Sequence, residues 1–161
     1  MSGNKIESLI NEAQSAFDRK PGHVETGLQT KEGDLLQLRK SCQLLAGANV
    51  LLEQGFYTLV IEASFVSVER VIEFKLLESG RDPRDLPGTH PGVYTEAMRR
   101  GILSEEIAER VQDLWRNHRA KTYYQDGLAT KERAESMFAL ATEIHLFVRN
   151  QSSKKYECLC T

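Results

Sequence analysis

The sequence predicts an all-α fold, an up-and-down bundle of four to five helices. Apolar residues recur three and four positions apart over long segments, which is the spacing of amphipathic helices. Glycine and proline fall between these segments, and short connections make consecutive helices antiparallel neighbours. With 161 residues, the chain is long enough to bury one core without disulfides or a metal ion.

Three parts follow from this pattern. Residues 1–33 comprise an amphipathic helix over 4–18 and a linker that is rich in glycine. Residues 34–150 form the helical bundle. Residues 151–161 have no apolar periodicity, so we expect a flexible tail.

Each helix of the bundle has its own start and stop signals. The segment 56–79 is the most apolar and should lie at the centre. Ser104 and Thr130 are predicted N-caps, and Gly55 is a predicted left-handed C-terminal cap. The expected helices are 34–54, 56–79, 93–100, 104–124 and 130–149, with a proline-rich loop over 80–92.

The segment 104–124 draws attention because its amphipathic stripe runs into a basic and aromatic end. The stripe consists of Ile107, Val111, Leu114 and Trp115. The polar and aromatic residues after it are Arg116, Asn117, His118, Arg119, Lys121, Tyr123 and Tyr124. An ideal helix turns about 100° per residue, which would place Arg116, Arg119 and Tyr123 on one face and His118 within the stripe. Such an end suits a phosphate or a carboxylate.

Composition excludes several classes of protein. A net charge of −2 argues against a surface that is basic throughout, and no apolar run is long enough to span a bilayer. The odd cysteine count and the lack of an apolar leader favour the cytoplasm. Phosphate-loop motifs are absent. The histidines show no metal-ligand spacing with each other or with Cys158 and Cys160, so we expect no metal and no cofactor.

The order of motifs from 101 onward resembles the C-terminal half of HEPN domains. It runs from Gly101-Ile-Leu-Ser-Glu-Glu through a helix to Arg116-Asn117, then Tyr123, and then a final helix that opens at Ala129. The likeness covers roughly 34–149. It implies a helical bundle that dimerises, and members include RNA-cleaving toxins and defence nucleases, nonenzymatic partners of nucleotidyltransferases, and nucleotide binders.

The nuclease members of that family carry an Arg, a polar residue that is often Asn, and then a His four to six residues after the Arg. Arg116 and Asn117 match, and Tyr123 resembles the aromatic residue that follows the His. Lys121 and Thr122 occupy the places of the His. A lysine needs a substantially lowered pKa for acid–base work near neutral pH, so the substitution preserves phosphate binding better than cleavage.

Three functions remain open. The first is a homodimer, in a toxin–antitoxin or defence context, that binds RNA, a nucleotide or an acidic partner such as a nucleotidyltransferase-type protein, with Arg119 and Tyr124 as ligand contacts. The second is a metal-independent endoribonuclease, in which Arg116 stabilises charge and His118 or Lys121 replaces the missing His.

The third function is purely structural, with the arginines serving only to pair with acidic residues of the central helix. Glu69 and Glu73 lie on that apolar helix, where a buried carboxylate needs a partner. In the first two functions the same carboxylates would orient Arg116 or Arg119.

Overall fold

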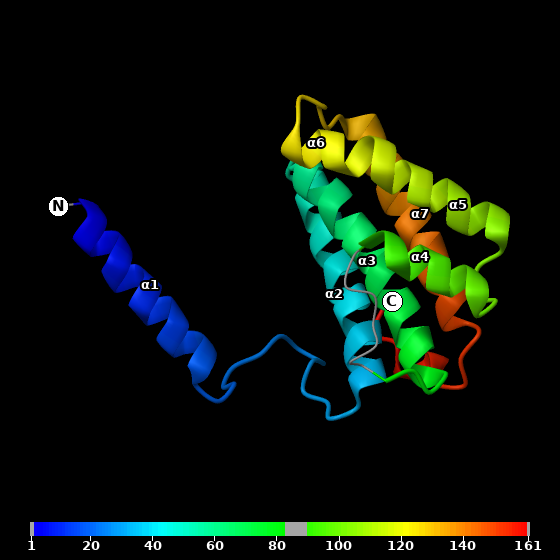
Figure 1. Cartoon of the computed structure of the whole chain (residues 1–161), viewed down its shortest axis with the longest axis horizontal. Coiled ribbons are helices and arrows are strands. Elements are labelled where there is room, and N and C mark those ends of the chain that lie inside the picture. Colours follow the sequence, from blue (N-terminus) through cyan, green and yellow to red (C-terminus); the bar gives the residue numbers. More distant parts are fainter. Residues whose placement is uncertain (1, 83–89, 161) are drawn as a thin grey trace.

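The computed structural model describes residues 2–82 and 90–160, and this part of the chain is an all-α helical bundle, which confirms the predicted fold class (Figure 1). Among the described residues no helix is both long and apolar enough to cross a membrane. The helices are α1 (Ser2–Asp18), α2 (Gly33–Glu53), α3 (Tyr57–Glu78), α4 (His90–Arg99), α5 (Glu105–Leu114), the π-helix η2 (Trp115–Arg119), α6 (Ala120–Tyr124), α7 (Lys131–Arg149) and the short 3₁₀ helix η3 (Lys155–Glu157).

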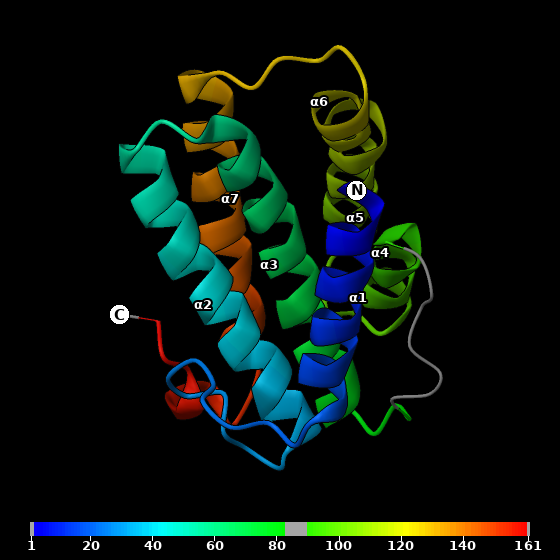
Figure 2. The ribbon, with the colours of Figure 1, turned by 90° about the vertical axis from the view of Figure 1, so that its left-hand side faces the viewer.

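The central helix is α3, as its apolar composition predicted. It packs against α2 and α7 on one side and against α4 and η2 on the other. Figure 2 shows α2 and α7 on one side of α3, and α4, α5 and α6 on its other side. The continuous rod formed by α5, η2 and α6 therefore lies against α3 and presents its far side outward.

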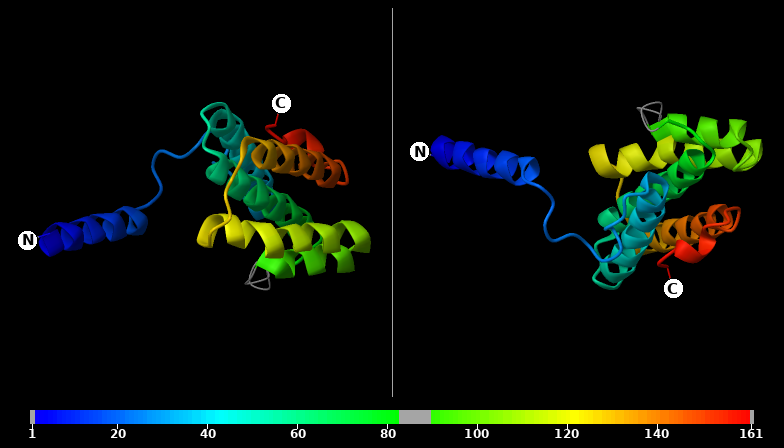
Figure 3. Two further views of the ribbon diagram at one scale, coloured as in Figure 1. Left: turned by 90° about the horizontal axis from the view of Figure 1, so that it is seen from above. Right: turned by 90° about the horizontal axis from the view of Figure 1, so that it is seen from below.

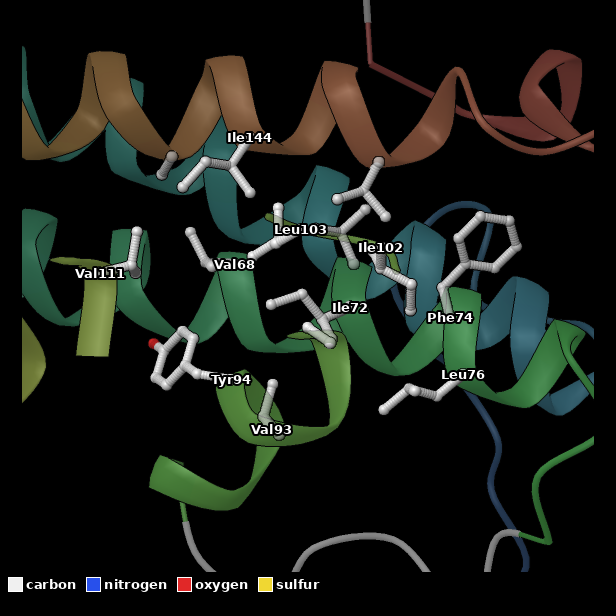
Figure 4. Close-up of a cluster of buried hydrophobic side chains, with 14 of the residues drawn as sticks. Val68, Ile72, Phe74, Leu76, Val93, Tyr94, Ile102, Leu103, Val111 and Ile144 are labelled. Atoms are coloured by element: carbon white, nitrogen blue, oxygen red, sulfur yellow. The ribbon is translucent and has the colours of Figure 1, made fainter. Parts of the chain in front are cut away.

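The core has two apolar clusters along α3. In the larger one, α3 contributes Val68, Ile72, Phe74 and Leu76, which meet residues of α4, α5 and α7 such as Tyr94 (Figure 4). The smaller one lies towards the α2–α3 turn and the start of α7. Its buried members are Ala48, Val60, Ile61, Phe65, Ala134 and Met137. Apolar side chains on several faces of α3 are thus buried.

The predicted caps at Ser104, Thr130 and Gly55 are confirmed. The Ser104 hydroxyl accepts from the Ile107 amide at 3.2 Å, and the Thr130 side chain likewise caps α7. Gly55 has φ of +82°, a conformation that residues with a Cβ rarely adopt. The loop predicted over 80–92 is three residues too long because α4 already begins at 90, and 83–89 lie outside the described residues.

The N-terminal helix α1 projects away from the bundle (Figure 3). Its side chains from residue 3 onward are exposed, including Ile6, Leu9, Ile10 and Phe17 of the apolar stripe. The linker behaves differently, since its second half lies on α2. Arg39 donates to the Gly27 carbonyl at 3.1 Å and Gln43 to the Thr26 carbonyl at 2.6 Å.

The C-terminal tail corrects the expectation of a flexible end. Residues 151–160 fold back onto the bases of α2, α3 and α7, and Ser152 is buried where its hydroxyl donates to Glu78. Lys154 pairs with Asp34 at 2.7 Å, and Glu157 pairs with Arg39 at 3.0 Å. The tail is held by individual hydrogen bonds and ion pairs to other helices. Such contacts need no regular spacing of apolar residues, which is why the sequence did not reveal them.

Candidate functional site

The rod made by α5, η2 and α6 positions the basic and aromatic residues. Ala108 and Val111 are buried against the core, whereas Ile107 at the edge of the predicted stripe is exposed. After Leu114 the backbone enters a π-helix, with hydrogen bonds five residues apart instead of four. Leu114 and Trp115 are partly buried against the apolar clusters, so the predicted stripe is correct at Val111, Leu114 and Trp115 and is wrong at Ile107.

The π-helix overturns the predicted grouping of the arginines. The wider turn changes which side of the rod each later residue occupies, and Arg116 and Lys121 lie on either side of the buried Arg119 in sequence. Both are exposed, and neither has an ion pair within the part of the chain that the structure describes. Arg119 instead points inward and is 6% exposed, although an ideal helix would place it beside Arg116.

Arg119 is buried in an ion pair, which does not fit its expected role as a ligand contact. Its Nε donates to Glu62 Oε2 at 2.9 Å and its Nη2 to Glu62 Oε1, a two-pronged pair. The hydrogen bond to Glu62 raises the pKa of Arg119. The guanidinium also lies 5.6 Å from the Trp115 ring centre. This pair holds the rod against α3 and so fixes where the exposed residues point.

The two predicted orienting carboxylates, Glu69 and Glu73, are both buried, but they lie near different partners. Glu73 accepts from Arg70 on its own helix at 2.7 Å and so does not orient the rod as predicted. Burial raises the pKa of Glu73 despite that partner. Glu69 lies near Arg119, and burial together with the smaller effect of the Glu69 charge raises the pKa of Tyr94. The carboxylate that pairs with Arg119 is Glu62, which was not one of the two predicted carboxylates.

His118 lies at a pocket, whereas ideal helical geometry predicted it within the packed stripe. The pocket has a volume of about 480 Å³ and lies between the rod, α3 and the start of α7. Its polar lining comprises His118, Thr122, Glu132, Arg133 and Ser136, and its apolar lining includes Phe65 and Leu140. A flat ligand such as a nucleobase would find apolar walls and a few polar partners there.

The rod ends in two exposed tyrosines. The rings of Tyr123 and Tyr124 meet edge to face, with 4.8 Å between their centres, and Tyr124 is 69% exposed. Just beyond them the Gly127 amide donates to the Lys121 carbonyl at 3.0 Å. A Cβ on Gly127 would lie 2.8 Å from the Lys121 carbonyl carbon, so glycine permits this tight reversal. We call Arg116, Asn117, His118, Lys121, Tyr123 and Tyr124 the basic–aromatic end.

A second group of reactive side chains gathers at the opposite end of the bundle. Cys42 of α2, His145 of α7, and Cys158 and Cys160 of the tail form the cysteine–histidine cluster, whose ligand atoms all lie within 4.8 Å of one another. Hydrogen bonds from the other two thiols lower the pKa of Cys158, and the bond to Cys158 raises that of Cys42 to about 11. The arrangement suits a soft metal ion, which the sequence spacing did not predict.

Comparison with known proteins identifies a family. A family model described as Domain of unknown function (DUF8154) matches residues 1–160. The chain belongs to the DUF8154 family. No curated protein and no solved structure matches the DUF8154 chain.

Sequence reasoning missed the cluster in this DUF8154 chain because Cys42 and His145 are 103 residues apart. Two weaker signals were available. Cys158 and Cys160 are separated by one residue, and Cys42 and His145 each lie within or beside the apolar stripe of a predicted helix. A thiol and an imidazole on facing buried stripes can meet only if the two helices pack together, and α2 and α7 do.

Proposed function

We propose that this DUF8154 protein binds single-stranded RNA through the basic–aromatic end. The observation that carries the proposal is the exposure of Arg116 and Lys121, five residues apart on the rod, without an ion pair in the described residues. A cation that has no protein partner retains its full capacity to bind a phosphate oxygen.

The aromatic residues favour a nucleic acid over an acidic protein partner. Tyr123 and Tyr124 are exposed on the same rod as the two cations, and exposed aromatic faces stack on unpaired bases irrespective of sequence. His118 and Thr122 line the adjacent pocket, whose apolar walls fit a base. A purely structural function explains Arg119, which is buried with Glu62, but it leaves the exposed residues without a role.

The resemblance to HEPN domains supports the same proposal and extends it. In that family the motif that Arg116 and Asn117 match lies at a dimer interface, so the proposal includes a homodimer in which two basic–aromatic ends form one RNA cleft. A toxin–antitoxin or defence setting, with a nucleotidyltransferase-type protein as partner, belongs to it as well. Lys121 replaces the imidazole of the nuclease members, so we propose binding without cleavage.

The experiment measures binding of the full chain to a fluorescent single-stranded RNA over a range of salt concentrations. Arg116→Ala should weaken binding about tenfold and lower the salt slope by about one, because one phosphate contact is lost. Arg99→Ala is the matched control, since Arg99 is also exposed but lies at the end of α4 and pairs with Glu96. It should leave RNA affinity unchanged.

Three results would contradict the proposal. Absence of RNA binding by the wild-type chain would leave the structural function. Equal loss in Arg116→Ala and Arg99→Ala would show only unspecific charge attraction. Cleavage of the RNA in the presence of EDTA, lost in Arg116→Ala, would establish the metal-independent endoribonuclease instead.

A further inference from the structure

The cysteine–histidine cluster consists of three sulfur atoms and one imidazole nitrogen that converge from three separate parts of the fold. His145 Nε2 lies 3.2 Å from Cys158 Sγ, 3.3 Å from Cys160 Sγ and 3.7 Å from Cys42 Sγ. Cys42 Sγ and Cys158 Sγ are 3.3 Å apart. Four ligands around a tetrahedral zinc ion, with bonds of 2.0–2.3 Å, lie about 3.4–3.8 Å from one another. The four distances given lie at 3.2–3.7 Å and all six lie within 4.8 Å, so small shifts of the side chains would bring the ligand atoms to that spacing.

The surroundings of His145 fit the tautomer that a metal needs. Its Nδ1 lies 2.7 Å from Ser41 Oγ, and Ser41 Oγ lies 2.9 Å from the Ser67 carbonyl oxygen, to which it can donate its single hydrogen. In that arrangement Nδ1 donates to Ser41, and the lone pair on Nε2 faces the three sulfurs. Metal-binding histidines are held in this way by their second nitrogen. His145 is 1% exposed, so the arrangement is built into the core.

The donor set selects the ion. Three thiolates and one imidazole favour zinc over magnesium or calcium, which prefer oxygen ligands. The four ligand atoms lie too close together to surround a cluster of several metal ions. Zinc with three thiolates would carry a net charge of −1, and Arg149 Nη1 already donates to Cys158 Sγ at 3.7 Å.

We propose that Cys42, His145, Cys158 and Cys160 bind one zinc ion that fastens the C-terminal tail to α2 and α7. Four protein ligands complete the tetrahedron and leave no position for water or substrate, so the site is structural. Zinc binding would replace the thiol protons, which leave to solvent, with three zinc–sulfur bonds. This site is at the opposite end of the bundle from the proposed RNA surface and does not depend on it.

The test uses the full chain, purified under reducing conditions from zinc-supplemented medium. We expect one zinc per chain by elemental analysis. After exchange into cobalt, the thiolate-to-cobalt absorption should have the intensity of three sulfur ligands. Cys160→Ser removes a half-buried ligand, so it should keep the fold and lose about one third of that intensity, with weaker zinc binding. His118→Ala is the control for loss of an imidazole outside the cluster and should retain one zinc.

Two results would overturn the proposal. One is a wild-type chain that contains no zinc and takes up no cobalt. A disulfide between Cys42 and Cys158, found by mass spectrometry of the oxidised chain, would then identify the cluster as a redox pair. The other is a Cys160→Ser variant whose zinc content, zinc affinity and cobalt spectrum equal those of the wild type. A cobalt spectrum of three thiolates in the wild type, obtained before any substitution, makes the test independent of how the variant folds.

Discussion

The two ends of the bundle differ in how their side chains were brought together. The residues of the basic–aromatic end are nearly continuous in sequence, but the fold leaves Arg119, which lies among them in the chain, outside it, because Arg119 is buried whereas Arg116 is exposed. The cysteine–histidine cluster comes from distant positions that the fold brings within 4.8 Å. Residues that are close in sequence therefore suggested a candidate site at the rod, but the sequence did not show which of them are exposed. The ligands of the cysteine–histidine cluster are far apart in sequence, so the sequence did not reveal them.

Removing the proposed zinc ion should have the largest effect on stability, and it should affect only the end of the bundle that contains the cysteine–histidine cluster. A zinc site filled at about a thousand times its dissociation constant adds about 4 kcal/mol to the free energy of unfolding. We expect excess chelator to lower Tm by about 10 °C, as measured by calorimetry. The tail should become sensitive to protease, and RNA affinity should not change. An unchanged Tm and an equally resistant tail would show that the tail is held without a metal.

Loss of Glu62 should have the next largest effect and would sharpen the distinction between the two arginines. Glu62→Ala leaves Arg119 buried without its carboxylate, although Glu62 is 23% exposed and solvent reduces the cost. We expect a loss of about 2 kcal/mol in the free energy of unfolding by urea denaturation. Arg116→Ala should cost almost nothing in the same measurement, because Arg116 is exposed. Equal costs for the two variants would contradict the assignment of separate roles.

Loss of Lys154 should have the smallest effect and tests how the tail is held apart from the metal. Burial alone would raise the pKa of Asp34, but hydrogen bonds from Lys154 and the Leu35 amide hold it below its usual value. A lowered pKa stabilises the fold above the unfolded value of about 4 and loses that effect as the pH falls through the folded value. Lys154→Ala should therefore cost less than about 1 kcal/mol at pH 7.

The same difference in unfolding free energy should vanish in acid, where Asp34 is protonated in both proteins. Lys155→Ala is the control, because Lys155 lies over the Tyr156 ring and has no ion pair in the described residues. Its effect should not change over this range. A cost of Lys154→Ala that persists below the folded pKa of Asp34 would show that Lys154 acts through something other than this pair.

Sequence patterns predicted the parts of the fold that depend on local rules. The caps at Ser104 and Thr130 and the glycine at 55 were found because each satisfies backbone groups or a backbone angle within a few residues. The helical faces were predicted less well. Arg119 is buried at the end of the π-helix, and no residue type in this segment predicts that the helix widens there.

What the sequence determined by itself was the all-α bundle with α3 at its centre, since apolar periodicity and turn residues act over short distances along the chain. The tertiary structure decided which charged side chains form ion pairs and which are exposed without one, because the Arg119–Glu62 pair depends on how the rod packs on α3. It also decided that Cys42 and His145 meet the tail. Contacts between residues far apart in the chain follow from helix packing, and that packing is not written in the spacing of any one segment.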